Sequence, residues 1–232
     1  RAASWTTSPS PSDPVRLFLS SYRFGTDPRV FVHLTGTPGR IAVIANAADA
    51  WPAAARAGAV TSETVALRSL GFAPEEVDLR DHPGDPGSLR ARLAEFPAVW
   101  VRGGNTFVLR ARLARSGGDA VLTDLVRSNR IVYGGYSAGA CVATPSLCGL
   151  EFSDDPGEVT TVCGGPVVWD GLGWVDHAIV PHTGDSLLAD DGVQRTLRYL
   201  RERGIAHVAL TDDDALVVDT PPGVDAPSTV NP

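Results

Sequence analysis

Lysine is absent from the chain, and this absence excludes several kinds of chemistry. All 20 basic residues are arginine. Without lysine the protein cannot form a Schiff base, a Walker-type phosphate site or a Ser-Lys dyad. An activated serine would therefore have to take its base from the histidines, of which there are five.

Methionine is also absent, and cysteine is scarce. The three cysteines, Cys141, Cys148 and Cys163, are odd in number and form no C-x-x-C motif. This favours reduced thiols over a disulfide framework or a zinc site, and we expect neither a metal nor a cofactor. Because there is no methionine, we expect the start of the chain to be missing or trimmed. Whether a targeting segment preceded Arg1 stays open.

The sequence has no apolar run near the roughly 18 residues of a membrane helix. Its N-terminus, RAASWTTSPSPSD, lacks the apolar core of a signal peptide. The net charge is -7 and the pI about 5.2, with the arginines scattered along the chain. These features argue against nucleic-acid and membrane partners and favour small or cationic ligands. We expect a cytoplasmic protein.

Apolar runs alternate with helical patterns, which predicts an α/β fold with a mainly parallel sheet. The expected strands are 15–20, 40–46, a weaker 76–79, 98–103, 131–136, 177–182, 207–212 and 215–219. The expected helices are about 51–70, 86–95, 105–116, 119–129, 138–143 and 190–203.

The length of 232 residues and the hydrophobic content of 43% fit a single domain, which we place at residues 15–219. We expect the segments 1–14 and 220–232 to be flexible. Residues 144–175 are rich in Gly, Pro and Asp and predict a long irregular excursion. This excursion is a candidate mobile lid that would limit the site to short peptides.

A nucleophile elbow is the most informative motif. Residues 131–142 read IVYGGYSAGACV, an apolar run that ends in Gly135-Tyr136-Ser137-Ala138-Gly139. A serine at a sharp strand-to-helix turn has strained backbone angles, so the positions two before and two after it must be nearly free of side chain. We therefore interpret Ser137 as a nucleophile.

In open parallel sheets, ligands bind at the carboxyl ends of the strands. The polar residues that close each apolar run are therefore candidate site residues. Ser137 closes the apolar run 131–136, His182 closes AIVP (178–181), and Asp212 closes HVALT (207–211). We expect all three at the same edge of one sheet, as nucleophile, base and orienting carboxylate. A purely structural role for His182 is the rival interpretation.

The identity of the carboxylate stays open. Asp213, Asp214 and Asp154 are alternatives to Asp212, and an acidic turn is usually only solvated.

A glycine-rich loop at 101–105 closes another expected strand. Glycine lets its backbone N–H groups approach a substrate closely, and together with the N–H of Ala138 they could form an oxyanion hole. A phosphate-binding nest is the rival interpretation.

Four segments together resemble the peptidase E family of serine peptidases. They are GGNTFVLR (103–110), GYSAGACVATPS (135–146), GLGWVDHAIVPH (171–182) and LTDDDALVV (210–218), and the resemblance covers about residues 15–219. It implies a three-layer sandwich of the flavodoxin-like, class I glutamine amidotransferase-like type. It also implies a cytoplasmic, metal-independent peptidase, with N-terminal aspartyl dipeptides as the substrate class.

The resemblance also implies roles for single residues. Ser137 would be the nucleophile, His182 the base and Asp212 the third member, while Gly104 and Ala138 would supply the oxyanion hole.

Further residues are accessory or substrate-binding candidates. Asp154 matches an acidic residue that the family carries after the elbow. Arg102 could pair with a substrate carboxylate, and Glu151, Asp154 or Asp155 could hold the free amine of the peptide. Asn105 belongs to the same glycine-rich loop. After His182, the helical segment ADDGVQRTLRYL (189–200) keeps only two arginines, Arg195 and Arg198.

The favoured function is a serine exopeptidase, a dipeptidase that acts through an acyl-enzyme, with Asp-X dipeptides as the first substrates to test. A cyanophycinase-like enzyme that cleaves β-aspartyl links is one alternative. An esterase and a non-catalytic binding module on the same fold are two others. The sequence leaves open whether the protein is a monomer or a homodimer.

Overall fold

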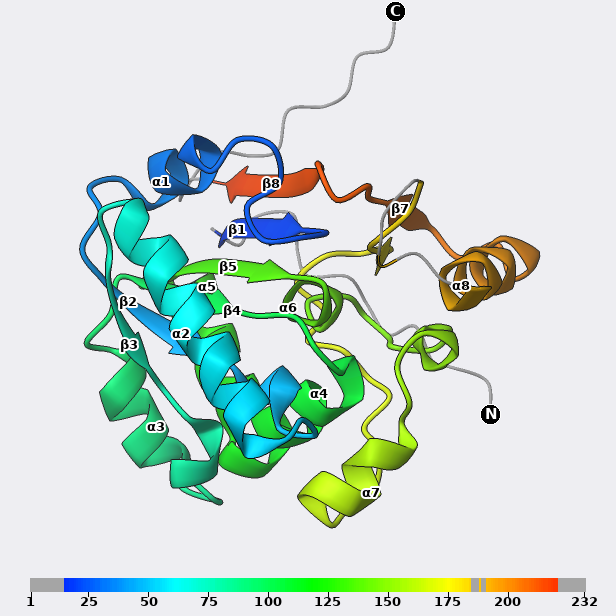
Figure 1. Ribbon diagram of the computed structural model, residues 1–232, viewed down its shortest axis with the longest axis horizontal. Helices are drawn as coiled ribbons and strands as arrows, with labels where there is room; N and C mark the ends of the chain where they lie inside the picture. Colours follow the sequence, from blue (N-terminus) through cyan, green and yellow to red (C-terminus); the bar gives the residue numbers. More distant parts are fainter. Residues whose placement is uncertain (1–14, 185–187, 189–190, 221–232) are drawn as a thin grey trace, which may run out of the picture.

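Two separate sheets organise the residues that the computed structural model describes, which are 15–184, 188 and 191–220 (Figure 1). The strands are β1 (Val15–Ser20), β2 (Arg40–Ile44), β3 (Ala73–Glu76), β4 (Ala98–Val101), β5 (Val132–Tyr136), β6 (Ala178–Val180), β7 (His207–Ala209) and β8 (Ala215–Thr220). The larger sheet has the order β3-β2-β4-β5-β1-β8 and is parallel except for the antiparallel pair β1–β8. Strands β6 and β7 form a small parallel sheet of their own.

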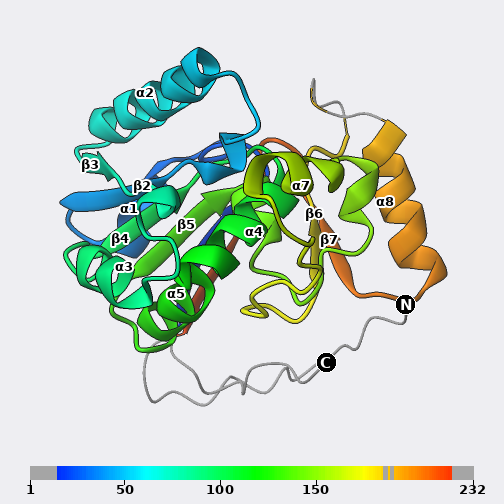
Figure 2. The ribbon, with the colours of Figure 1, turned by 90° about the horizontal axis from the view of Figure 1, so that it is seen from below.

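Helices cover both faces of the larger sheet, which gives three layers (Figure 2). They are α1 (Arg29–Thr35), α2 (Ala53–Ser69), α3 (Pro86–Leu93), α4 (Thr106–Ser116), α5 (Gly118–Arg127), α6 (Ala138–Cys141), α7 (Gly157–Cys163) and α8 (Asp191–Glu202). Three short 3-10 helices are η1 (Asn46–Ala48), η2 (Leu79–Asp81) and η3 (Leu150–Phe152). The prediction of an α/β fold with a mainly parallel central sheet is confirmed. Within the described residues, no helix combines the length and apolarity needed to cross a membrane.

The alternation of side chains along the strands divides the core in two. Phe18 points to the face covered by α1 and α2, where it packs with Phe31 and Trp100. Leu17 and Leu19 point to the opposite face, where aliphatic side chains of α3, α4 and α5 complete the core. A period of two along a strand buried on both faces produces this division.

The expectation that 177–182 and 207–212 belong to the same sheet as the elbow is wrong. The edge beside β1 is occupied by β8, which pairs antiparallel with it from Val15 opposite Thr220 to Ser20 opposite Ala215. The segments that contain β6 and β7 therefore pair with each other in a separate sheet, over three residues each.

Two smaller expectations are also corrected. The weak strand expected at 76–79 lies earlier, as β3, because η2 already begins at Leu79. The excursion 144–175 is not wholly irregular, since it contains η3 and the seven-residue helix α7. The predicted flexible ends, 1–14 and 220–232, lie outside the described residues apart from Thr220, which ends β8.

Arginines of α4 tie the excursion 144–175 to the core. Arg110 Nε donates to the Asp170 carbonyl at 2.8 Å, and Arg112 Nη2 donates to the Val162 carbonyl at 3.1 Å. Because these bonds hold both arms of the excursion to one helix, the packing favours a fixed wall over a lid that swings as a unit.

Candidate active site

Ser137 lies at the sharp turn between β5 and α6. Its backbone has φ +50° and ψ −116°, a conformation that residues other than glycine rarely adopt. A Cβ on Gly139 would lie 2.2 Å from the Val101 carbonyl oxygen, and one on Gly135 would lie 2.7 Å from the Gly139 carbonyl oxygen. Close packing of the turn against β4 and β5 therefore requires both glycines of the motif.

His182 and Asp212 approach Ser137 from the ends of β6 and β7. His182 Nε2 is 3.0 Å from Ser137 Oγ, and His182 Nδ1 is 2.7 Å from Asp212 Oδ1. An ionised carboxylate only accepts hydrogen bonds, so Nδ1 carries the proton and Nε2 accepts from the Ser137 hydroxyl. This geometry matches that of a nucleophile, a general base and an orienting carboxylate.

The two aspartates next to Asp212 make other contacts. The Asp214 carboxylate accepts from the backbone N–H and the hydroxyl of Thr211 at 2.8 and 2.6 Å, and these bonds lower the pKa of Asp214. The Asp213 carbonyl accepts from the Thr26 N–H at 3.1 Å. Among the described residues, Asp212 is thus the aspartate whose carboxylate contacts His182.

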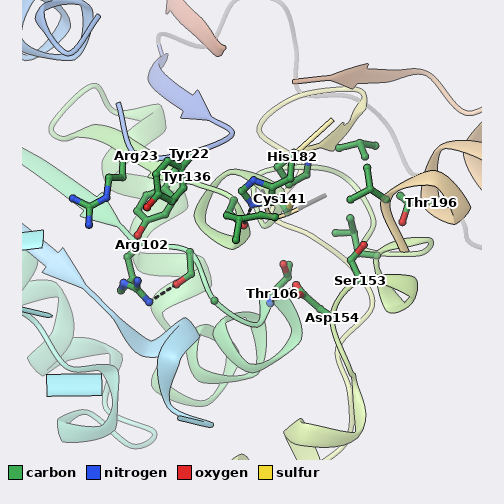
Figure 3. Close-up of a pocket in the computed structure, with 18 of the residues that line it drawn as sticks. Tyr22, Arg23, Arg102, Thr106, Tyr136, Cys141, Ser153, Asp154, His182 and Thr196 are labelled. Atoms are coloured by element: carbon green, nitrogen blue, oxygen red, sulfur yellow. Dashed lines mark hydrogen bonds between the residues drawn. The ribbon is translucent and has the colours of Figure 1, made fainter. Parts of the chain in front are cut away.

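Ser137 and His182 line a pocket of about 410 Å³, within the range of roughly 300–1,000 Å³ that small-molecule sites occupy. Its lining divides into two sides, with Arg23 and Arg102 on one and Asp154 on the other (Figure 3). The pocket therefore has basic side chains at one end and an acidic side chain at the other.

The arginine side is held rigidly. The Arg102 guanidinium stacks 4.8 Å from the Trp51 ring centroid, and its Nε lies 3.5 Å from Oε1 of the fully buried Glu63. The Tyr136 hydroxyl also donates to Glu63, at 2.7 Å. Burial and, after it, the Glu63 charge raise the pKa of Tyr136, which stays a neutral donor. Because this side has two guanidinium groups, Arg23 and Arg102, and one carboxylate, Glu63, it keeps an excess positive charge.

Helix α8 contributes no arginine to the described lining of the pocket. Its lining residues are Val193 and Thr196. The Arg195 guanidinium instead lies over the Phe152 ring, 4.4 Å from the ring centroid. The cationic side of the pocket is thus built by the segments after β1 and β4.

Asp154 forms the acidic side. Its carboxylate is partly buried and accepts from the Thr106 N–H at 2.8 Å. Burial is the largest influence and raises the pKa of Asp154, although the bonds from Thr106 oppose it. A carboxylate that has lost solvation in this way would gain from a cationic group of a ligand.

The glycine-rich loop follows β4 and borders Ser137. A Cβ on Gly103 would lie 2.9 Å from the Ser137 Cβ, and one on Gly104 would lie 2.4 Å from the Ala47 carbonyl oxygen. Gly104 has φ +147° and lines the pocket. Ala138 is the first residue of α6, where a backbone N–H has no acceptor within the helix. A role for Gly104 and Ala138 in an oxyanion hole stays a prediction.

Two of the other candidates do not line the pocket. Asn105 is a helix cap, with Oδ1 accepting from the Phe107 N–H and Nδ2 donating to the Asp155 carbonyl. The Glu151 carboxylate accepts from the Gly149 N–H. Asn105 thereby fixes the loop, whereas Glu151 fixes its own turn.

Cys141 also lines the pocket, one helical turn after Ser137. Burial raises the pKa of its thiol, which disfavours the reactive thiolate. Across residues 15–184, 188 and 191–220, no group of three or more His, Cys, Asp or Glu side chains is arranged to hold a metal ion.

Comparison with protein families decides the assignment. The family model described as peptidase family S51 matches residues 40–221, a range that includes Ser137, His182 and Asp212. The chain belongs to peptidase family S51. The resemblance to peptidase E that the sequence motifs predict is thereby confirmed.

The family assignment agrees with individual relatives of this S51 member. Over 164 residues this chain is 32% identical to Peptidase E of Streptomyces coelicolor. The alignment covers 68% of this chain and 63% of the relative. This chain is also 30% identical over 117 residues to the uncharacterized peptidase Lmo0363 of Listeria monocytogenes. That alignment covers 50% of this chain and 54% of the relative. The alignments thus span about half to two thirds of these relatives.

Solved structures support the fold of this S51 member. A crystal structure from Listeria monocytogenes EGD-e, named as a candidate peptidase E, has a TM-score of 0.72 at 22% identity and covers 89% of this chain and 95% of the other. A peptidase from an acI-B1 Actinobacterium has a TM-score of 0.66 at 15% identity, covering 90% and 85%.

Sequence reasoning missed several residues at this site of the S51 chain. Ser21 ends the apolar run of β1, so the rule that found Ser137 also points to it. Arg23 lies on the turn that follows. Glu63 gives no such signal, because a charged residue on a helical pattern is normally solvated.

Proposed function

We propose that the protein is a serine exopeptidase that hydrolyses short peptides through an acyl-enzyme. Ser137 is the nucleophile, His182 the general base and acid, and Asp212 the carboxylate that orients the imidazole. The observation that carries this proposal is the pair of contacts from His182, 3.0 Å to Ser137 Oγ and 2.7 Å to Asp212 Oδ1.

Acylation begins when His182 Nε2 takes the Ser137 proton as Oγ attacks the scissile carbonyl carbon. The carbonyl oxygen becomes an oxyanion, for which we propose the N–H groups of Gly104 and Ala138 as donors. Asp212 stabilises the imidazolium that forms. His182 then gives its proton to the leaving amine, which departs and leaves an ester on Ser137.

Deacylation repeats these steps with water. His182 takes a proton from the water as its oxygen attacks the ester carbonyl, and returns that proton to Ser137 Oγ when the ester bond breaks. The products are the released N-terminal residue and the regenerated serine.

The two charged sides of the pocket support a short peptide as substrate. We assign the free amine to Asp154, because a cation there compensates the lost solvation of its carboxylate. We assign a substrate carboxylate to Arg102, with Arg23 as a neighbouring charge. Dipeptides with N-terminal Asp fit these requirements and are the first substrates to test.

The decisive experiment compares wild type with Ser137→Ala on Asp-X, Glu-X, β-Asp-X and neutral dipeptides, with amino acid release followed by mass spectrometry. Wild type should release the first residue, while the variant should lose about 10⁶-fold in kcat. Release from β-Asp-X alone would identify the cyanophycinase-like alternative. Hydrolysis of esters without peptides would contradict the proposal in favour of an esterase, and no turnover of either would favour a binding module.

A second variant tests the assignment of the arginine side. Arg102→Gln should lower kcat/KM for acidic dipeptides by about 10- to 100-fold, the value of a charge-assisted hydrogen bond of about 1.5–3 kcal/mol, and change neutral dipeptides little. The matched control is Arg90→Gln, whose exposed side chain pairs with Asp124 outside the described pocket lining. Equal losses on acidic and neutral dipeptides would reject Arg102 as a specificity residue.

A further inference from the structure

Ser21 connects three separate parts of the chain at one buried position. It directly follows β1 and is fully buried. Its hydroxyl oxygen accepts from the His182 backbone N–H at 2.7 Å, and its hydroxyl donates to Asp212 Oδ1 at 3.1 Å. Its own N–H donates to the Asp214 carbonyl at 3.2 Å. One serine thus contacts both the histidine and the aspartate of the candidate site.

The directions of these bonds are fixed by chemistry. A backbone N–H can only donate, so the bond from His182 uses a lone pair of Ser21 Oγ and leaves its single proton for Asp212. Asp212 Oδ1 accepts this proton and also the proton on His182 Nδ1. The result is a closed ring from the His182 backbone through Ser21 and Asp212 back to the His182 imidazole.

This ring holds His182 in an unusual backbone conformation. His182 has φ +59°, in the left-handed region that non-glycine residues occupy only when their surroundings keep them there. The bond from its N–H to Ser21 Oγ is a contact that does so. The imidazole direction is set by the same backbone, so Ser21 acts on both ends of the histidine.

The neighbouring residue joins the nucleophile to the same point. The Ser137 N–H donates to the Ser20 carbonyl at 3.0 Å. Strand β1 runs toward the small β6–β7 sheet (Figure 1), with Ser20 as its last residue and Ser21 directly after it. Ser20 fixes the elbow of one sheet, and Ser21 fixes the base and the acid of the other.

We propose that Ser21 is a positioning residue that aligns His182 and Asp212 with Ser137. This inference rests on the proposed serine peptidase function. Ser21 is absent from the described lining of the pocket, so its loss should act on kcat and leave KM within about twofold. A small misplacement of the base typically costs up to 10²-fold, and we expect a decrease of about 10- to 100-fold in kcat.

The kinetic test compares Ser21→Ala, Ser21→Cys and Ser21→Thr on the dipeptide that the wild type cleaves. Alanine removes both bonds, cysteine keeps the size but weakens them, and threonine keeps the hydroxyl and should retain the most activity. The matched control is Ser116→Ala, which removes another buried hydroxyl, bonded to the Arg112 carbonyl at 2.9 Å. This control should keep wild-type kcat.

A second readout works without turnover. The proton on His182 Nδ1 should give a low-field NMR resonance that disappears in His182→Ala. Loss of Ser21 should shift or broaden this resonance, while Ser116→Ala should leave it unchanged. If Ser21→Ala does not fold, Ser21→Cys carries both measurements.

The outcomes separate this inference from the proposed function. Folded Ser21 variants with wild-type kcat and an unchanged resonance would overturn the positioning role while the peptidase stands. A loss of activity that only matches the unfolded fraction would overturn it as well. If wild type cleaves no peptide, the proposed function fails, and the NMR comparison still tests the hydrogen-bonded ring.

Discussion

The two sheets place their parts of the candidate site in different ways. The six-stranded sheet fixes Ser137 locally, because the elbow follows directly from β5 and packs through Gly135 and Gly139. The two-stranded sheet has only three residues in each strand, and His182 and Asp212 form hydrogen bonds with Ser21, more than 150 positions earlier in the chain. A nucleophile can thus be encoded by a short motif, whereas its partners are placed by tertiary contacts.

The largest expected effect tests the two-stranded sheet. Asp212→Asn should lower kcat by about 10³- to 10⁴-fold, because an amide no longer fixes the tautomer with the proton on Nδ1. The control Asp213→Asn changes an exposed neighbour and should stay within a fewfold of wild type. Steady-state kinetics per folded molecule checks both. Equal losses in the two variants would mean that Asp212 has no special part in orienting His182.

A smaller effect tests the six-stranded sheet. Gly104→Ala places a Cβ 2.4 Å from the Ala47 carbonyl oxygen at φ +147°, so the glycine-rich loop must shift. If this loop holds the oxyanion, kcat should fall by about 10²- to 10³-fold. Gly39→Ala is the control, since a Cβ there meets nothing within 4 Å. Wild-type kcat in a folded Gly104→Ala protein would rule out the loop as an oxyanion donor.

The smallest effect concerns Asp154, which belongs to neither sheet. Its pKa is raised in the folded protein, so the folded state favours the protonated carboxyl more than the unfolded chain does. The stability from this preference is present at acid pH, below the unfolded pKa, and is lost as the pH rises through the raised folded pKa. Asp154→Asn keeps an acceptor for Thr106 and carries no charge, so it should melt at a higher temperature than wild type at neutral pH.

Thermal melts between pH 4 and pH 8 check this sign, because the difference between the two proteins should close toward acid pH. The same variant should lose about 10-fold in kcat/KM on peptides with a free amine. Asp155→Asn is the control on the exposed neighbouring residue. A melting difference that is independent of pH would show that charge at Asp154 is not its cause.

The sequence was sufficient to predict the sharp strand-to-helix turn at Ser137, because the elbow is a local motif. It also predicted that His182 and Asp212 lie near Ser137, but from the assumption of one shared sheet edge. The observed reason is different, since β8 takes the place beside β1 and the two residues arrive from a separate sheet. The prediction that residues at the strand ends lie together was nevertheless correct, because the strands of both sheets direct their carboxyl ends toward the same pocket.

The sequence could not predict the arginine side of the pocket in full. Arg102 follows an expected strand, so it could be found. Glu63 lies within the long helix α2, where nothing in the local pattern distinguishes a buried carboxylate from a solvated one. Its burial results from contacts with Trp100 and Tyr136, which only the packed structure brings together.

The arginines that tie the excursion 144–175 to α4 have a consequence for ligand recognition. Asp154 belongs to this excursion, so the acidic end of the pocket is ordered before any peptide arrives. Binding then costs little loop-ordering entropy, and selectivity arises from fit to a preformed shape. Backbone amides of the excursion should accordingly exchange slowly with deuterium in the unliganded protein and change little in their protection when a peptide is added.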